Sequence, residues 1–259
     1  MKTKQKLTIA IASYKEVAIF ERCLNAIDEI ADEIVIFDGK SDDGTKEILS
    51  DYPKVKAKFV DNNQMFHINK QMAIDACSGD WILQLDVDEV VSEKLASEIV
   101  KKINSNPEEN GFWINRSNYF LGKFLKKGGV YPDPTIRLYR KGKGKLPCKD
   151  VHEQAEVDGE VGHLKNDLLH FSDPTFSRYL IRQDRYTTLL ANDLEKDGVK
   201  ISNGSFVSYY ICKPFYWFLL GFLRNRGYVD GFPGFVWALF SAMRFPIAYT
   251  KLWEKKHQK

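Results

Sequence analysis

The 259-residue sequence has few cysteines, little net charge and no long uncharged hydrophobic run. The four cysteines are scattered and form no CxxC pair, which argues against a structural zinc site and a disulfide framework and suits a reducing compartment. The formal net charge is only +3, so overall charge gives no indication of a nucleic-acid partner. The length suits one large domain, or one domain with an appendage.

The sequence also lacks the hydrophobic segments of signal peptides and simple spanning helices. The apolar stretch Leu7 to Ala12 is shorter than the signal-peptide core of roughly 7–15 residues, so we interpret it as a buried strand. No stretch of about 18 uncharged apolar residues occurs, so an uninterrupted spanning helix is not expected. We find no internal repeat, no low-complexity segment and no Gly-rich phosphate loop after the first strand.

The first 104 residues alternate between predicted strands and predicted helices. Hydrophobic patterns predict strands at 7–12, 33–38, 56–60 and 80–86, and helices at 17–30, 45–52, 68–77 and 93–103, the last capped by Ser92. This alternation indicates a mostly parallel sheet covered by helices on both faces. In such sheets ligands bind beyond the carboxyl ends of the strands.

Polar and acidic residues stand at those strand ends. The first strand ends in Ser13 to Glu16, the second in Asp38, and the fourth in Asp86-Val87-Asp88-Glu89. Two neighbouring carboxylates repel unless one is protonated or a cation lies between them. A hard ion such as Mg²⁺ or Mn²⁺ prefers oxygen ligands and often completes its shell with phosphate oxygens. The pattern therefore predicts a metal site that holds a diphosphate; a plain acidic surface turn is the alternative.

The loop after the second strand offers two more acids. Asp38 can accept hydrogen bonds from a nucleobase, and Asp43 lies in the same loop. The alternative is an Asx-rich turn in which Asp43 or Thr45 caps the next helix.

The middle and the end of the chain have different compositions. Three short strand-like segments at 111–122, 135–146 and 167–172 predict smaller antiparallel pieces added to the main sheet. Residues 206–253 hold 16 of the 34 aromatic residues and one acid, Asp230, against five bases. This tail is typical of interfacial helices with a Lys/Arg rim that anionic lipid attracts. The alternative is a helical subdomain packed on the core or on a second subunit.

Three motifs in the first 90 residues occur in a family-specific order: SYKE (13–16), FDGKSDDGT (37–45) and NKQMAIDACSGDWILQLDVDE (69–89). They resemble the nucleotide-binding half of inverting glycosyltransferases of family 2, with the GT-A fold. The later motifs RLYRKGKG, VHE and LLHFS, together with the aromatic tail, are similar to the lipopolysaccharide-core branch, which transfers glucose or a similar sugar onto lipooligosaccharide. The resemblance covers most of the chain and is least informative over 176–205.

The resemblance implies an α/β fold, the GT-A (Rossmann-like) type, with a mostly parallel mixed sheet flanked by helices and a helical, aromatic-rich C-terminal extension. The catalytic domain is expected at 1–200, with the nucleotide-binding half at 1–104 and the acceptor-side half at 105–200. The amphipathic helical extension is expected at 201–259.

The resemblance also assigns a nucleotide pocket. Ser13, Tyr14 and Glu16 would line it. Asp38 would hold the uracil, and Asp43 would support that loop.

The same resemblance assigns the region around the diphosphate. Lys70 would face the nucleotide, although Asn69-Lys70-Gln71 stands where the family more usually has an Arg-Asn pair. Asp86 would contact the ribose or a metal-bound water, and Asp88 would bind the metal directly.

The chemistry needs a base that takes a proton from the acceptor hydroxyl while the nucleoside diphosphate leaves. We favour Glu153 for this role, with Asp150 as the second candidate; a solvated surface acid is the alternative for Glu153. His152 and His170 could complete the metal shell or bind diphosphate, or could be structural.

Two arginines of the RLYRKGKG motif also have two interpretations. Arg137 and Arg140 could meet phosphates of a donor or of an anionic acceptor, or could belong to a solvated loop.

The sequence therefore predicts a metal-dependent inverting glycosyltransferase that uses a UDP-sugar donor, Mg²⁺ or Mn²⁺, and a glycolipid or lipid-linked saccharide acceptor. We expect a peripheral protein on the cytoplasmic face of a bacterial inner membrane, with no nucleic-acid partner. A nucleotidyltransferase acting on a sugar phosphate is the alternative, although the missing Gly-rich phosphate loop speaks against it. A non-enzymatic, membrane-associated sugar-binding or scaffold protein is a third possibility.

Overall fold

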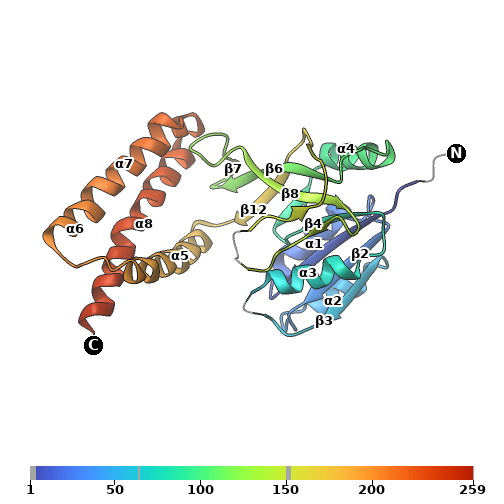
Figure 1. Ribbon diagram of the computed structural model, residues 1–259, viewed down its shortest axis with the longest axis horizontal. Coiled ribbons are helices and arrows are strands. Elements are labelled where there is room, and N and C mark those ends of the chain that lie inside the picture. Colours follow the sequence, from blue (N-terminus) through green and yellow to red (C-terminus); the bar gives the residue numbers. More distant parts are fainter. Residues whose placement is uncertain (1–3, 64, 150–152, 259) are drawn as a thin grey trace. The chain divides into compact units, whose positions relative to one another are not determined.

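A computed structural model describes residues 4–63, 65–149 and 153–258, and the chain forms two compact units (Figure 1). The first unit comprises residues 1–116 and 133–170, and the second comprises 117–132 and 171–259. The second unit thus includes residues 117–132 and 171–200, which the sequence analysis assigned to the acceptor-side half of the catalytic domain.

A ten-stranded mixed sheet has the strand order β3-β2-β1-β4-β8-β6-β12-β5, with β7 and β11 also paired to β6. Its strands are β1 (Leu7–Ser13), β2 (Glu33–Asp38), β3 (Val55–Phe59), β4 (Trp81–Leu85), β5 (Glu89–Val91), β6 (Gly111–Phe120), β7 (Lys123–Phe124), β8 (Asp133–Arg140), β11 (Val161–His163) and β12 (Leu168–Asp173). β9 (Gly144–Lys145) and β10 (Glu156–Val157) form a separate pair. Strands β1 to β4 are parallel, and β8 and β12 add antiparallel pairings. The predicted α/β sheet of the GT-A type is confirmed.

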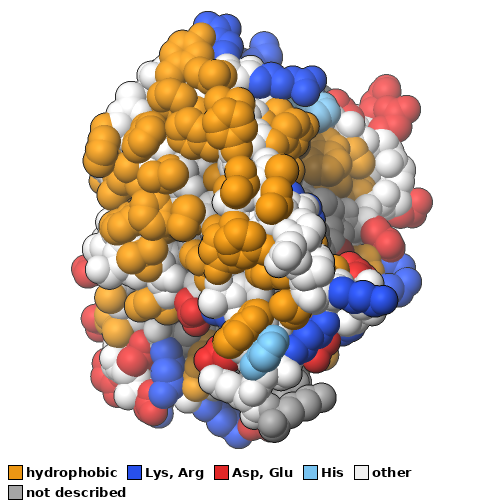
Figure 2. Space-filling view, turned by 90° about the vertical axis from the view of Figure 1, so that its left-hand side faces the viewer, with side chains coloured by type: hydrophobic (Ala, Val, Ile, Leu, Met, Phe, Trp, Pro, Cys, Tyr) orange, Lys and Arg blue, Asp and Glu red, His pale blue; other side chains and the backbone are white. Residues whose placement is uncertain are grey.

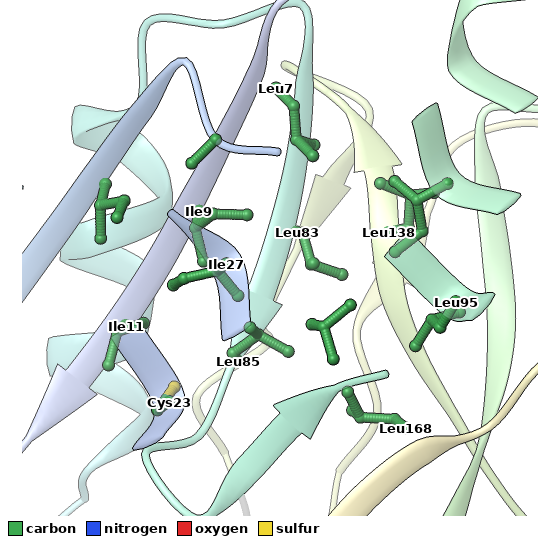
Figure 3. Packing of buried hydrophobic residues seen from close by; sticks show 14 of the residues in the cluster. Leu7, Ile9, Ile11, Cys23, Ile27, Leu83, Leu85, Leu95, Leu138 and Leu168 are labelled. Carbon is green, nitrogen blue, oxygen red and sulfur yellow. The ribbon is translucent and has the colours of Figure 1, made fainter. Parts of the chain in front are cut away.

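Helices cover both faces of the parallel strands because successive side chains of a strand point to opposite faces. Ile9 and Ile11 of β1 pack with residues of α1 (Val17–Ile27) in one buried cluster (Figure 3). Ala10 belongs to a second cluster, with residues of α3 (His67–Ala76). The helices α2 (Thr45–Ser50) and α4 (Glu93–Asn104) complete this part of the fold.

The eight elements predicted for residues 1–104 are all present, with ends within three residues of the prediction. Ser92 caps α4 as expected, because its hydroxyl accepts a hydrogen bond from the backbone N–H of Leu95. The short strand β5 was not predicted, because three residues give too short a pattern.

Helices make up most of the second unit. They are α5 (Phe176–Lys196), α6 (Asn203–Val207), η1 (Ser208–Cys212), α7 (Lys213–Leu219), η2 (Leu220–Arg224), η3 (Gly227–Asp230) and α8 (Phe232–His257). One buried cluster joins Phe120, Leu125 and Val130 to Tyr179 of α5 and Val236 of α8. A second joins α5 to the far half of α8 through Ala191, Ala248 and Leu252.

The continuous helical run Asn203–Arg224 is exposed and apolar. Among the described residues it is the one run whose length and composition would suit a membrane crossing: 22 residues with a mean hydropathy of 1.2. Such a helix was not expected from the sequence, because Lys213 interrupts the uncharged stretch. Figure 2 shows hydrophobic side chains gathered across the face of the molecule on which α6 to α8 lie.

Candidate active site

The acidic turn after β4 is fixed by its own hydrogen bonds. The backbone N–H of Asp86 donates to Oε2 of Glu89 at 2.9 Å, and the N–H of Glu89 donates to the carbonyl of Asp86 at 2.9 Å. Glu89 is fully buried at the start of β5. The turn therefore holds Asp86 and Asp88 on a rigid support at the carboxyl end of a buried strand, as the sequence predicted.

Two buried cations neutralise Asp86. Lys70 of α3 forms an ion pair with Oδ1, and the guanidinium of Arg137 on β8 lies 2.8 Å from Oδ2. Arg137 also lies 2.6 Å from Oε1 of Glu89. Burial raises the pKa of Asp86, but Lys70 and Arg137 outweigh it and hold this pKa far below its usual range. Asp86 is therefore a carboxylate whose charge is already matched by protein groups.

Asp88 has a different partner. Its Oδ2 lies 3.4 Å from Nε2 of His170. The pairing of β12 with β5 sets His170 opposite Glu89, which brings the histidine beside the acidic turn. Burial raises the pKa of Asp88, but the hydrogen bond and charge of His170 lower it below its ordinary value.

Asp88 and His170 offer two ligands to a divalent ion. No group of three or more His, Cys, Asp and Glu side chains suited to a metal is found in the described part of the chain. Mg²⁺ keeps several waters and takes one or two carboxylates plus substrate phosphates, so a site with few protein ligands fits it. The residues present therefore fit an ion whose remaining ligands are diphosphate oxygens and water.

The predicted nucleotide-pocket residues gather at the ends of β1 and β2. Ser13 and Asp38 are paired in register, and the hydroxyl of Ser13 donates to Oδ2 of Asp38 at 2.8 Å. The N–H and hydroxyl of Ser41 donate to the same carboxylate at 2.6 and 2.7 Å. Asp38 is fully buried, so it shapes the loop from inside. Its contact with uracil stays a prediction.

Asp43 ties the same loop to the start of α1. Its carboxylate accepts hydrogen bonds from the backbone N–H of Val17 at 3.0 Å and of Thr45 at 3.2 Å. The bonds to Thr45 are those of the Asx turn given as the alternative, and the role of Asp43 in supporting a nucleotide pocket stays a prediction. Glu16 lies at the N-terminal end of α1 and is half-buried, whereas Tyr14 is exposed at the rim.

Glu153, the predicted base, is held by several donors. Its carboxylate accepts the backbone N–H groups of Cys148 and Lys149, and Oε1 lies 3.3 Å from Nδ1 of His67. Each oxygen of a charged carboxylate can accept more than one hydrogen bond, so Glu153 can still accept a proton from an acceptor hydroxyl while it keeps these contacts. The second candidate, Asp150, and also His152, lie outside the described residues.

Three participants were not assigned from sequence. His67 sits in an ordinary pattern that gives no signal of burial or pairing. Glu89 was noted in the acidic cluster but given no role, and Arg137 was left between a phosphate contact and a solvated loop. The structure excludes the solvated loop for Arg137, which is 7% exposed. Arg140 instead stacks over Trp81 at 4.6 Å from the ring centre.

Comparison with known sequences decides the family. The family described as "Glycosyl transferase family 2" matches residues 8–153, which is more than half of the chain. The chain belongs to this family of glycosyltransferases. The family supplies the enzyme class, a nucleotide-sugar-dependent glycosyltransferase, and the matched segment contains the acidic turn, Lys70 and Glu153.

Relatives of this family 2 glycosyltransferase match over nearly its whole length. "Lipopolysaccharide core biosynthesis glycosyltransferase LpsC" of Rhizobium meliloti (strain 1021) is 26% identical over 97% of this chain and 93% of its own. "Uncharacterized glycosyltransferase RT0209" of Rickettsia typhi is also 26% identical, over 96% of this chain and 87% of its own.

A solved structure shares the fold of this glycosyltransferase. It is the "Mannosyltransferase PcManGT from Pyrobaculum calidifontis in complex with GDP-Man and Mn2+". It is 11% identical, covers 98% of this chain and 89% of its own, and has a TM-score of 0.52. At this identity the likeness establishes the GT-A fold alone.

Proposed function

We propose that this glycosyltransferase moves a hexose, glucose in the first instance, from a UDP-sugar to a glycolipid acceptor such as lipopolysaccharide core or a lipid-linked saccharide. The reaction inverts the anomeric configuration and depends on Mg²⁺ or Mn²⁺. It takes place at the cytoplasmic face of the inner membrane, where the enzyme is a peripheral protein.

One observation supports the donor chemistry above all. In the acidic turn Asp86 is already neutralised by Lys70 and Arg137, whereas Asp88 faces His170. The two acids therefore have different tasks. Asp86 holds the cations and fixes the turn, and Asp88 with His170 would hold the metal. Lys70 and Arg137 carry two positive charges against the three negative charges of Asp86, Asp88 and Glu89, a sum of +2 − 3 = −1. A divalent ion on Asp88 would change this sum to +1, which suits a diphosphate.

Different residues of this chain would carry out the separate steps of the transfer. The acceptor oxygen forms a bond to the anomeric carbon, the bond from that carbon to the diphosphate oxygen breaks, and UDP departs. Glu153 accepts the hydroxyl proton. The charge that develops on UDP is stabilised by Lys70 and Arg137, which the buried acids hold in place. A bound divalent ion would supply further stabilisation of the diphosphate.

Two observations support a lipid-anchored acceptor. LpsC, by its name a lipopolysaccharide core enzyme, matches this chain from end to end, including the helical second unit. That unit exposes apolar side chains along η1 and α7, among them Ile211, Phe215 and Tyr216, which are 58–64% exposed. Such a surface suits an enzyme whose acceptor lies in a membrane.

The test is a transfer assay with defined products. The protein is incubated with UDP-glucose, UDP-galactose or GDP-mannose, with Mn²⁺, and with core-truncated lipopolysaccharide or a lipid-linked saccharide. The proposal predicts release of UDP and an acceptor that carries a sugar in the inverted configuration, which NMR reports. Release of pyrophosphate from a nucleoside triphosphate, or a product with retained configuration, would contradict it.

A further inference from the structure

In the second unit, the lysine-containing loop 121–130 is bound to the turn 221–232, which connects the helical run Asn203–Arg224 to α8. Asp230 is the single acid of residues 206–253, and it is 2% exposed. Its Oδ2 accepts the backbone N–H groups of Lys126 and Lys127 at 2.9 and 2.8 Å, and its Oδ1 lies 3.7 Å from the ammonium of Lys123. The carboxylate is thus used inside the fold, and no acid of residues 206–253 faces outward.

Glycines let the backbones of the loop and the hairpin turn approach closely. The N–H of Gly128 donates to the carbonyl of Asn225 at 2.9 Å. A Cβ added to Gly227 would lie 2.8 Å from the carbonyl oxygen of Gly221, closer than side chains tolerate, and it would lie in contact with the loop, 3.4 Å from Cα of Gly128. The loop 121–130 and the turn 221–232 therefore form one structure, which we call the basic tip.

The basic tip combines exposed bases with exposed apolar side chains. Its outward bases are Lys126, Lys127, Arg224 and Arg226. None of these four pairs with an acid among the residues that the structure describes. Its exposed apolar residues are Leu223, Tyr228, Val229 and Phe232, at 45–72% exposure. In Figure 2, Lys and Arg side chains lie along the upper border of the hydrophobic face.

We propose that the basic tip is a membrane-docking site, in which Leu223, Tyr228 and Phe232 enter the headgroup region while the four bases bind phosphates of anionic lipids. The proposal rests on the membrane-bound acceptor proposed above and names the segment that makes the contact. Apolar side chains beside cations suit the boundary between headgroups and acyl chains, where each base contributes about 1 kcal/mol of attraction.

The charge of the basic tip favours lipid over a second copy of the chain. A symmetric dimer through this surface would set the four bases of one copy against those of the other, with no outward acid of the tip to offset them. An anionic bilayer has no such conflict. The fold also arranges the four bases before any lipid is present, because Asp230 and the glycines hold Lys126 and Lys127 beside Arg224 and Arg226.

The test is flotation of the full chain with vesicles of phosphatidylcholine alone or with 30% phosphatidylglycerol. The tip variant replaces Lys126, Lys127, Arg224 and Arg226 by Gln. The matched control replaces four exposed lysines of the first unit by Gln, at Lys46, Lys94, Lys101 and Lys141. Both variants lower the formal net charge from +3 to −1, that is +3 − 4, so only the position of the charges differs.

The proposal predicts that the tip variant binds anionic vesicles on the order of 100-fold more weakly than the wild type, with the control changed less than about threefold. Binding of the wild type should weaken steeply with added salt. Equal binding by the two variants, or a wild type that ignores anionic vesicles, would overturn the proposal. Thermal stabilisation by UDP is measured on the same protein samples. If UDP stabilises none of them, the result counts against the transferase assignment. If UDP stabilises the wild type but the wild type does not float with anionic vesicles, the result counts against membrane docking by the basic tip alone.

Discussion

Oδ2 of Asp88 and Nε2 of His170 lie 3.4 Å apart, although the two residues stand on segments far apart in the sequence. The pairing of β12 with β5 produces this relationship, because it sets His170 opposite the residue after Asp88. A carboxylate and an imidazole at this separation can bind one divalent ion together, each through the atom that now faces the other. Asp86, by contrast, is paired with Lys70 and Arg137, so the proposed metal-binding role falls to Asp88 and His170.

Replacement of Asp88 should abolish transfer while leaving the fold intact. Asp88→Asn removes the charged ligand but leaves the buried pairing of Asp86 with Lys70 and Arg137 in place. We expect transfer to fall at least about 1,000-fold, because one ligand of a two-ligand site is lost. Transfer rate and thermal midpoint are measured together, with exposed Asp158→Asn as the control. Full activity in Asp88→Asn would remove the metal role.

His170→Gln should act on the metal requirement more than on the fold. We expect the Mn²⁺ concentration for half-maximal transfer to rise about 10- to 100-fold, since a remaining carboxylate binds the ion alone. Titration of transfer with Mn²⁺ measures this shift. An unchanged titration curve would show that His170 is structural.

Loss of Arg137 should destabilise the protein strongly. Arg137→Leu leaves Asp86 and the fully buried Glu89 without their shared cation, and breaking a buried ion pair typically costs about 3–5 kcal/mol. Urea unfolding measures the free energy of unfolding. The exposed Lys141→Leu is the control, with an expected change within about 0.5 kcal/mol. A double variant with Glu89→Leu should recover part of the loss, and no recovery would contradict the pairing.

Glu153→Gln tests the base. The N–H of Cys148 donates to Oε1 and that of Lys149 to Oε2, so the single amide oxygen of Gln keeps one of these hydrogen bonds, and it cannot take the acceptor proton. We expect transfer to fall about 100- to 10,000-fold with donor binding retained. Transfer rate and UDP affinity are the two measurements, and exposed Glu156→Gln is the control. Normal turnover in Glu153→Gln would shift the role to Asp150, whose Asn variant is assayed in parallel.

Glu33 should make stability depend on pH. Burial raises its pKa, but hydrogen bonds from Lys56, Ser78 and Thr8 outweigh it and lower the value from 4.5 to about 2. A carboxylate with a depressed folded-state pKa contributes its stability above about pH 4.5, and the contribution is lost as the pH falls toward 2.

The free energies of unfolding of the wild type and Glu33→Gln should therefore differ on the order of 2 kcal/mol at pH 7. The difference should shrink steadily between pH 4.5 and pH 2, as measured by urea unfolding at a series of pH values. A difference that stays constant with pH would contradict the assigned hydrogen bonds.

The sequence predicted those parts of the fold that depend on short-range patterns. Buried strands such as Glu33–Asp38 and the Ser92 cap are encoded within a few residues, and the acidic turn follows directly from its strand. What could not be predicted depends on distant pairings. The motif RLYRKGKG singled out Arg137 as a phosphate contact or part of a solvated loop, but its pairing with Asp86 and Glu89 depends on β8 running antiparallel to β4.

The grouping of segments into the two compact units also depends on contacts between residues far apart in the sequence. The domains expected from the family resemblance, 1–200 and 201–259, are each a continuous stretch of chain. By its contacts, the loop 117–132 groups with the C-terminal helices, because Asp230 and close glycine packing hold it there. Such a contact joins residues about a hundred positions apart, which composition cannot reveal.

The most direct test of the central claim is the thermal midpoint of wild type and Asp88→Asn with UDP, UDP-sugars and other nucleotides, each with Mn²⁺ or with EDTA. A ligand that binds only the folded state raises the midpoint by mass action. We expect UDP and one UDP-sugar to stabilise the wild type with Mn²⁺, and we expect EDTA or Asp88→Asn to remove the effect. Equal stabilisation in EDTA, or by Asp88→Asn, would contradict a metal held by Asp88.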